Sequence, residues 1–179
     1  MNKVLKKVLN TSLYILIVLI LTYCAVVFLG QRTAVIGSSM EPTLSDGDNL
    51  IVDKITYRFR EPERFEIIVF PYQYARNTYY IKRIIGLPGE RVRIDEAGNI
   101  YINGEILQES YGMEKIEEAG LAAEEIILDD DEYFVMGDNR NDSSDSRFVS
   151  VGNIRRGNIV GRAWMRIYPL KDFGILKHF

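Results

Sequence analysis

The strongest constraint on the fold is a long stretch near the N-terminus without charge. Residues 8–31 carry no charged side chain, and Leu, Ile, Val, Tyr and Phe dominate the stretch 13–29. A helix over residues 11–29 would be roughly 28 Å long at about 1.5 Å per residue, close to the hydrocarbon thickness of a bilayer. The sequence therefore predicts one transmembrane helix over 11–29, preceded by a short N-terminal segment, 1–10.

Two other interpretations of this stretch fit less well. A core helix of this length is rarely apolar on every face. A cleaved signal peptide has a shorter apolar region and a small-x-small site after it, which residues 28–32 lack. Lys3, Lys6 and Lys7 precede the stretch, whereas only Arg32 follows it closely. The positive-inside tendency then predicts a single-pass protein of the cell membrane, in contact with lipid, with a cytoplasmic N-terminus and an extracytoplasmic domain over 31–179.

Composition excludes several classes of site and partner. The chain has one cysteine, Cys24, and one histidine, His178, so it cannot form an internal disulfide or a multi-cysteine metal site. With a single histidine, second from the C-terminus, the chain is also a poor candidate for a Ser-His-Asp triad. We expect neither a metal nor a cofactor. The net charge of −3 without a Lys/Arg stripe argues against a nucleic-acid partner. We also expect a monomer.

The part of the chain after residue 31 is rich in short β-type runs separated by turn signals. One exception is 109–125, an acidic, alanine-containing stretch that we expect to be a surface insertion with some helix. The fold class expected is mainly β: one antiparallel domain on a membrane stalk. The expected strands are 50–57, 66–72, 77–85, 92–94, 100–102, 105–107, 133–136 and 159–168.

Two segments have side chains that could carry chemistry. Gly37 and Pro42 bracket the pair Ser38-Ser39 in a segment that is neither regular helix nor long strand. Farther on, strand alternation puts Lys82 on one face with apolar neighbours, which would bury its amine and lower its pKa. Each feature alone has an ordinary explanation, since serines near Gly and Pro are common in turns and strand lysines often extend to solvent.

A third segment, residues 137–147, is densely polar and follows an apolar run. Opposite charges stand close together in it, Asp138 with Arg140 and Asp145 with Arg147. Such a loop can fold on its own ion pairs and present Ser143 to a neighbour. A calcium loop of the EF-hand type is excluded, because Arg140 and Ser143 would stand where a ligand and a glycine are required.

Together the three segments resemble the conserved boxes of the type I signal peptidases, Ser/Lys-dyad proteases that remove signal peptides from exported proteins. Residues 39–44 (Ser-Met-Glu-Pro-Thr-Leu) match the nucleophile box, 80–90 match the lysine box and 137–147 match the third box. Gly47-Asp48 and 166–170 resemble flanking segments, in the same order. The size and single span resemble the short bacterial forms. The resemblance implies a signal-peptidase-like antiparallel β catalytic domain.

The resemblance also implies a role for individual residues. Ser39 would be the nucleophile, Lys82 its general base, and Ser143 the group that orients the lysine. The backbone N–H of Ser39 would donate to the oxyanion, while Gly37 stands where some members have an oxyanion serine, which leaves the second donor open. A lysine base must be neutral, so it needs burial away from carboxylates. The residues implied to hold the third-box loop in shape are Asp138, Arg140, Asp145 and Arg147.

The implied substrates are signal-peptide-bearing pre-proteins cut after small-x-small sites such as Ala-x-Ala. The substrate would be extended and pair with strand edges, and a shared bilayer would raise its effective concentration. The alternative is a catalytically inactive, membrane-tethered β binding module, because fold and motif do not prove turnover. The residues expected to line the substrate pockets are Ile36, Met40, Leu44, Tyr80 and Ile81.

Overall fold

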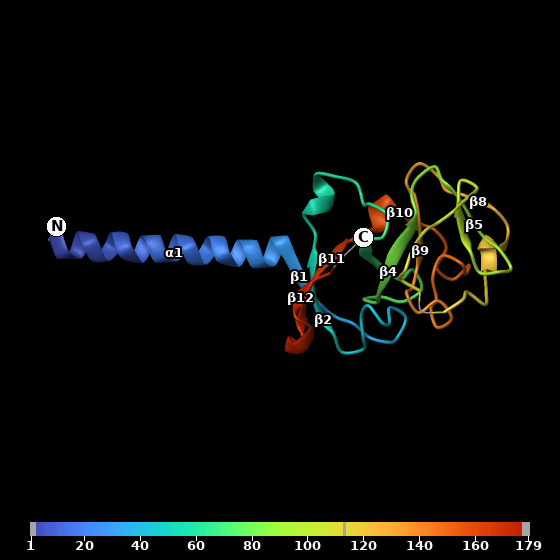
Figure 1. Cartoon of the computed structure of the whole chain (residues 1–179). Coiled ribbons are helices and arrows are strands. Elements are labelled where there is room, and N and C mark those ends of the chain that lie inside the picture. The colour runs from blue at the N-terminus through green and yellow to red at the C-terminus, as the bar shows by residue number, and fades with distance from the viewer. Residues whose placement is uncertain (1–2, 113, 177–179) are drawn as a thin grey trace.

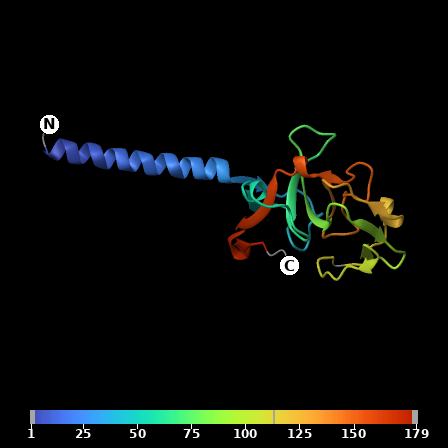
Figure 2. The ribbon, with the colours of Figure 1, turned by 90° about the horizontal axis from the view of Figure 1, so that it is seen from above.

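The computed structural model describes residues 3–112 and 114–176, and for residues 21 and 23–30 only their backbone. Helix α1 (Lys3–Leu29) projects from a β-rich body and leads directly into strand β1 (Gly30–Ala34) (Figures 1 and 2). Among the residues described, no helix combines the length and the apolar character needed to cross a membrane. His178 lies outside the described residues, and so does the side chain of Cys24.

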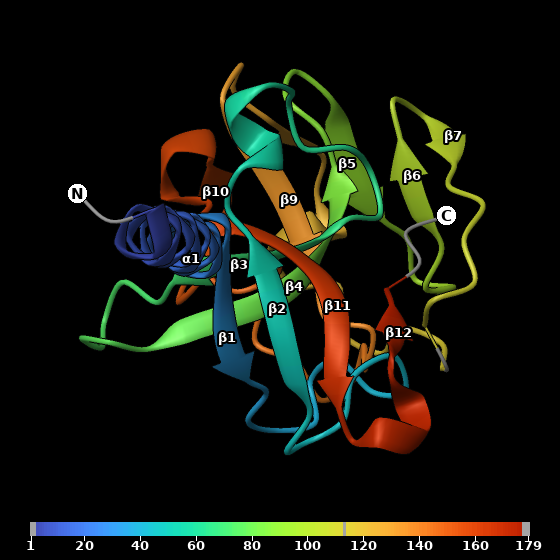
Figure 3. The ribbon, with the colours of Figure 1, turned by 90° about the vertical axis from the view of Figure 1, so that its left-hand side faces the viewer.

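The main sheet has eight strands, and every pairing in it is antiparallel. Its order is β1-β2-β11-β3-β4-β9-β10, with β12 on β11. Figure 3, a view along α1, shows β1 and β2 beside the base of the helix. The bounds of the strands after β1 are β2 (Asn49–Asp53), β3 (Ile67–Pro71), β4 (Tyr79–Gly86), β9 (Glu132–Met136), β10 (Ile154–Arg155), β11 (Gly161–Tyr168) and β12 (Gly174–Ile175).

A second, four-stranded antiparallel sheet lies at the end of the body far from α1 (Figure 1). Its order is β7-β6-β5-β8. It packs on Ile85 of β4 and on Phe134 and Met136 of β9 in one apolar cluster, so the two sheets share a core. The bounds are β5 (Arg91–Ile94), β6 (Ile100–Ile102), β7 (Glu105–Ile106) and β8 (Ile126–Ile127).

The prediction of a mainly antiparallel β fold is confirmed, but one local prediction needs correction. The run 50–57 is not one strand: β2 ends at Asp53, whose carboxylate accepts the backbone N–H groups of Ile55 and Thr56 and the Thr56 hydroxyl proton. These bonds turn the chain into a 3-10 turn, η1 (Thr56–Arg58). The described part of 109–125 contains a short 3-10 helix, η2 (Gly120–Ala123). Two further 3-10 turns are η3 (Arg156–Asn158) and η4 (Leu170–Asp172).

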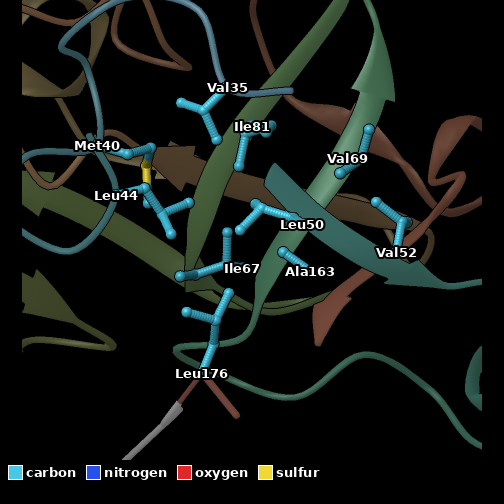
Figure 4. Close-up of a cluster of buried hydrophobic side chains, with 10 residues drawn as sticks. All are labelled: Val35, Met40, Leu44, Leu50, Val52, Ile67, Val69, Ile81, Ala163 and Leu176. Atoms are coloured by element: carbon cyan, nitrogen blue, oxygen red, sulfur yellow. The ribbon is translucent and has the colours of Figure 1, made fainter. Parts of the chain in front are cut away.

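One apolar cluster fixes residues 37–44, which we call the serine segment, to the main sheet (Figure 4). Met40 and Leu44 come from that segment, and both are fully buried among side chains of β2, β3 and β4. Burying two side chains of this size contributes roughly 1.5–3 kcal/mol each. The position of Ser39 is therefore set by its neighbour in the core rather than by an exposed loop. The cluster comprises Val35, Met40, Leu44, Leu50, Val52, Ile67, Val69, Ile81, Ala163 and Leu176.

Candidate active site

The serine segment turns sharply just before and after Ser39. Gly37 has φ +92°, a conformation that a residue with a Cβ rarely adopts, and its N–H donates to the Asp46 carboxylate at 2.8 Å. After the serine, the N–H of Leu44 donates to the carbonyl of Met40 at 2.9 Å. With Met40 buried on one side of it, Ser39 stays partly exposed at the surface of the body.

Lys82 comes from the middle of β4 and reaches Ser39. Its Nζ lies 2.7 Å from the Ser39 Oγ and 3.1 Å from the carbonyl oxygen of Ile81, to which it also donates. Pairing of Ile68 with Lys82 places β3 beside it, and the lysine is only 4% exposed. Two residues far apart in sequence thus meet within hydrogen-bond distance.

Burial sets the charge of this amine. Desolvation lowers the pKa of Lys82 to about 8, and the carboxylates of Asp145 and Asp138 oppose that shift by favouring the ammonium form. The expectation that no carboxylate lies near the lysine is therefore wrong. Burial still dominates, and each of the two carboxylates is paired with its own buried arginine. An amine with this pKa is neutral in a sizeable fraction of molecules near neutral pH.

The predicted pairing of Asp138 with Arg140 is wrong. Asp138 instead pairs with Arg83 of β4, at 2.8 Å from Nε and 2.6 Å from Nη2, and both side chains are fully buried. Successive residues of β4 face opposite sides of the sheet, so Arg83 points away from the side of Lys82. The strand therefore places the Lys82 amine on one side and, on the other, the arginine that binds Asp138 of the loop 137–147. Asp138 also accepts the Thr43 hydroxyl proton at 2.5 Å, which ties the loop to the serine segment.

The second predicted pair, Asp145 with Arg147, is confirmed. The Arg147 Nε lies 2.8 Å from one carboxylate oxygen, and Nη2 lies 2.9 Å from the other. Asp145 also accepts the N–H of Gly137 at 3.0 Å. Arg140 is buried too, but its partner is Glu109, outside the loop.

Ser143 lies beside the dyad without the expected bond. Its buried Oγ has no hydrogen-bond partner among the residues that the structure describes, and Lys82 donates to Ile81 instead. The hydroxyl is near the Ser39 carbonyl oxygen, since a Cβ at Gly137 would clash with both atoms at 2.3 Å. Gly137 is therefore a position where only a hydrogen fits between loop and serine segment. The lysine-orienting role of Ser143 stays a prediction.

The loop also contacts the serine segment through residues to which the sequence pattern assigned no role. The N–H of Asn139 donates to the Ser39 carbonyl at 3.1 Å, and its side-chain amide donates to the Ser38 carbonyl at 3.3 Å. The Ser38 hydroxyl donates to Asp142 at 2.5 Å. That bond commits the hydroxyl proton of Ser38, which therefore cannot also donate to an oxyanion.

A cleft of about 880 Å³ opens over the dyad. Two stretches, 33–40 and 77–82, and the loop residues 141–144 form most of its wall. Four of the five expected pocket residues line it: Ile36, Met40, Tyr80 and Ile81. Leu44 does not line the cleft; its side chain lies with those of Met40 and Ile81 in the buried cluster of the core. Among the described residues, no group of three or more His, Cys, Asp or Glu side chains is arranged to hold a metal ion.

Comparison with known proteins identifies the family of the chain. The family model described as signal peptidase, peptidase S26, matches residues 8–168. A probable signal peptidase I-2 of Synechocystis sp. is 43% identical over 155 residues, covering 83% of this chain and 68% of the relative. A signal peptidase I of Leptolyngbya laminosa is 40% identical over 156 residues, covering 83% and 74%.

A crystal structure of a signal peptidase I from Enterococcus faecalis V583 aligns with 57% of this chain and 97% of its own, at 32% identity and a TM-score of 0.47. The family model spans most of the chain, and both sequence relatives are named as peptidases of one kind. The chain therefore belongs to the signal peptidases of peptidase family S26, serine endopeptidases that remove signal peptides.

Proposed function

We propose that Ser39 is the nucleophile of this endopeptidase and Lys82 its general base. The observation that carries the proposal is the 2.7 Å hydrogen bond between the Lys82 Nζ and the Ser39 Oγ, made by an amine that is almost fully buried. A serine hydroxyl needs an adjacent base within this distance to attack a carbonyl. The relatives are named as peptidases, which favours an enzyme over the inactive binding module.

The proton transfers follow from a neutral Lys82. As the Ser39 Oγ attacks the scissile carbonyl carbon, the amine takes the hydroxyl proton and becomes an ammonium ion. That ion then donates its proton to the leaving amine, and the acyl group stays on Ser39. A water molecule, deprotonated by the regenerated amine, hydrolyses the ester. The backbone N–H of Ser39 is our proposed oxyanion donor, since it is fixed beside the attacking oxygen.

The substrate is proposed to lie extended in the cleft, between the stretches 33–36 and 78–81. Both stretches line the cleft, and β1 is the terminal strand of the main sheet, so backbone groups there can pair with an added strand. Ile36, Met40, Tyr80 and Ile81 would meet the side chains before the cut. Apolar walls of this kind suit the small residues of an Ala-x-Ala site.

The membrane topology is also a proposal. We place the anchor at 11–29, residues 1–10 in the cytoplasm and the catalytic domain, 31–179, outside. The support is the charge-free stretch, with Lys3, Lys6 and Lys7 before it. Anchor and substrate would then share one bilayer, with lipid as a further contact. We propose that the enzyme acts as a monomer and without nucleic acid.

The test is cleavage of a pre-protein whose signal ends in Ala-x-Ala, with full-length protein in detergent. We expect wild type to cut after the second alanine, and Ser39→Ala and Lys82→Ala to lose nearly all activity. Ser45→Ala and Lys171→Ala are matched controls, because both residues are exposed. An active Lys82→Ala would disprove the assigned base. A folded wild type that cuts none of several pre-proteins would disprove the substrate class.

A further inference from the structure

The insertion at 109–125, which we expected at the surface, is hydrogen-bonded to the third-box loop, residues 137–147. We call its described residues 109–112 and 114–122 the arm. The Glu109 carboxylate accepts two hydrogen bonds from the Arg140 guanidinium, at 2.5 and 2.7 Å. Arg140 is 4% exposed, so its charge depends on this partner. Its Nε donates in turn to the Gly137 carbonyl at 3.0 Å, at the start of the loop.

The arm contacts the loop at two further points. The Asn141 side chain accepts the N–H of Glu117 at 3.0 Å and donates to the carbonyl of Lys115 at 3.0 Å. At the far end, the N–H of Leu121 donates to the Arg147 carbonyl at 2.8 Å. Gly120 comes so close there that a Cβ on it would lie 2.3 Å from the Arg147 oxygen.

The arm has a firm support of its own. Ile116 and Ala122 are buried in the apolar cluster under the second sheet, with β5 and β6 side chains around them. Contacts made from a packed segment restrict the loop more than contacts made from a mobile one would. The second sheet therefore supports the arm, and the arm supports the loop.

The opposite side of the same loop contacts the nucleophile. Asn139 donates to the Ser39 carbonyl, and Asp142 accepts the proton of Ser38. The loop is thus held between the arm on one side and the serine segment on the other. A displacement of Arg140 or Asn141 would be transmitted over one or two residues to the bonds that hold Ser39.

We propose that the arm positions Ser39 against Lys82, acting through the third-box loop, and that the Glu109–Arg140 pair is its principal contact. The proposal rests on the proposed Ser39–Lys82 dyad. Glu109 is a positioning residue, since it lies outside the residues that line the cleft. Loss of positioning by a fraction of an ångström slows the chemical step while leaving the substrate groove intact.

The test is steady-state cleavage of the Ala-x-Ala pre-protein by full-length Glu109→Gln, which removes the charge and keeps the shape. We expect kcat to fall about tenfold or more, with KM within about twofold of wild type. Glu109→Asp restores the charge and should recover much of kcat. Glu124→Gln removes an exposed charge elsewhere in the insertion and should match wild type.

A double-mutant cycle identifies the route. If Glu109 acts through Arg140, then Glu109→Gln added to Arg140→Gln should lower kcat no further. Gly120→Ala tests the second contact without changing a charge, and carries the test if Glu109→Gln does not fold. It should also lower kcat at unchanged KM. Gly157→Ala is its control, because a Cβ there meets no atom within 4 Å.

Two results would overturn the proposal. One is wild-type kcat in folded Glu109→Gln and Gly120→Ala. The other is a raised KM with kcat unchanged, which would mean that the arm serves substrate binding. Either result would leave the dyad intact as long as Ser39→Ala and Lys82→Ala remain inactive, so the two proposals fail separately.

Discussion

Replacing Lys82 by Met should abolish cleavage and yet make the protein more stable at neutral pH. Methionine has about the same reach as lysine, is apolar, and fits a site that is 4% exposed. The lowering of the lysine pKa from 10.5 to about 8 means that folding disfavours the ammonium form by about 3 kcal/mol. The variant avoids that cost, although it also loses two hydrogen bonds worth about 1 kcal/mol each.

The pH dependence separates these two contributions. Below pH 8 the folded and unfolded states both hold the lysine proton, so the destabilisation is complete. Between pH 8 and about 10.5 the unfolded state holds the proton while the folded state has lost it, and the wild type gains stability as pH rises. The stability advantage of Lys82→Met should therefore shrink by about 3 kcal/mol between pH 7 and pH 11.

The assay is denaturant unfolding of wild type and Lys82→Met, in one detergent, at several pH values from 7 to 11. Other groups that titrate in this range are common to both proteins and cancel in the difference. Lys171→Met is the matched control, because this lysine is exposed and its substitution should give a difference that does not vary with pH. A pH-independent difference for Lys82→Met would refute the claim that burial lowers the pKa of Lys82.

Four further results are expected. The kcat/KM of wild type should rise about tenfold from pH 7 to pH 9, since the neutral fraction of Lys82 rises from about a tenth to about nine-tenths; a flat profile would contradict a lysine base. Asp138→Asn should cost about 3–5 kcal/mol in denaturant unfolding, because it leaves Arg83 buried without its partner. The same variant should move the pH–rate midpoint downward, since Asp138 raises the pKa of Lys82; an upward shift would contradict this electrostatic account. Leu44→Ala should cost about 2–5 kcal/mol in the same unfolding assay, whereas the exposed Leu170→Ala should be nearly neutral; equal effects would show that Leu44 does not anchor the serine segment.

Local patterns were enough to predict the β class and most strands. Alternation and turn residues are short-range signals, and they placed β3, β4, β5, β6, β9 and β11 close to their observed bounds. The strand β2 was predicted too long because its end depends on side-chain bonds from Asp53. The strands β1, β8, β10 and β12 were not predicted, although β7, which also has only two residues, was. The division into two sheets depends on long-range pairing.

The sequence predicted which residues gather at the site, but not all of the contacts that they make there. Motifs identified Ser39 and Lys82, and the structure brings them together at 2.7 Å. The charge pattern suggested that Asp138 pairs with its neighbour Arg140, but the tertiary fold offers Arg83, which is close in space and far in sequence. One signal for this pair was available in the sequence. Strand alternation puts Arg83 on the same face as Ile81 and Ile85, which are both apolar. Nothing in the sequence of 109–125 indicated that Glu109 would meet Arg140.

The adjacency of Lys82 and Arg83 in β4 has a consequence for changes in chain length. Successive residues of a strand face opposite sides, so an insertion or deletion of one residue there would exchange the two. The guanidinium, which is a permanent cation, would then face Ser39 and could never accept its proton. Residues 72–76, which follow β3 and precede the cleft-lining stretch 77–82, lie outside both strands and can vary in length. Within β4, a shift by one residue thus turns a permanent cation toward Ser39, and a shift by two residues keeps the lysine on its side of the sheet but moves it by about 6.6 Å along the strand.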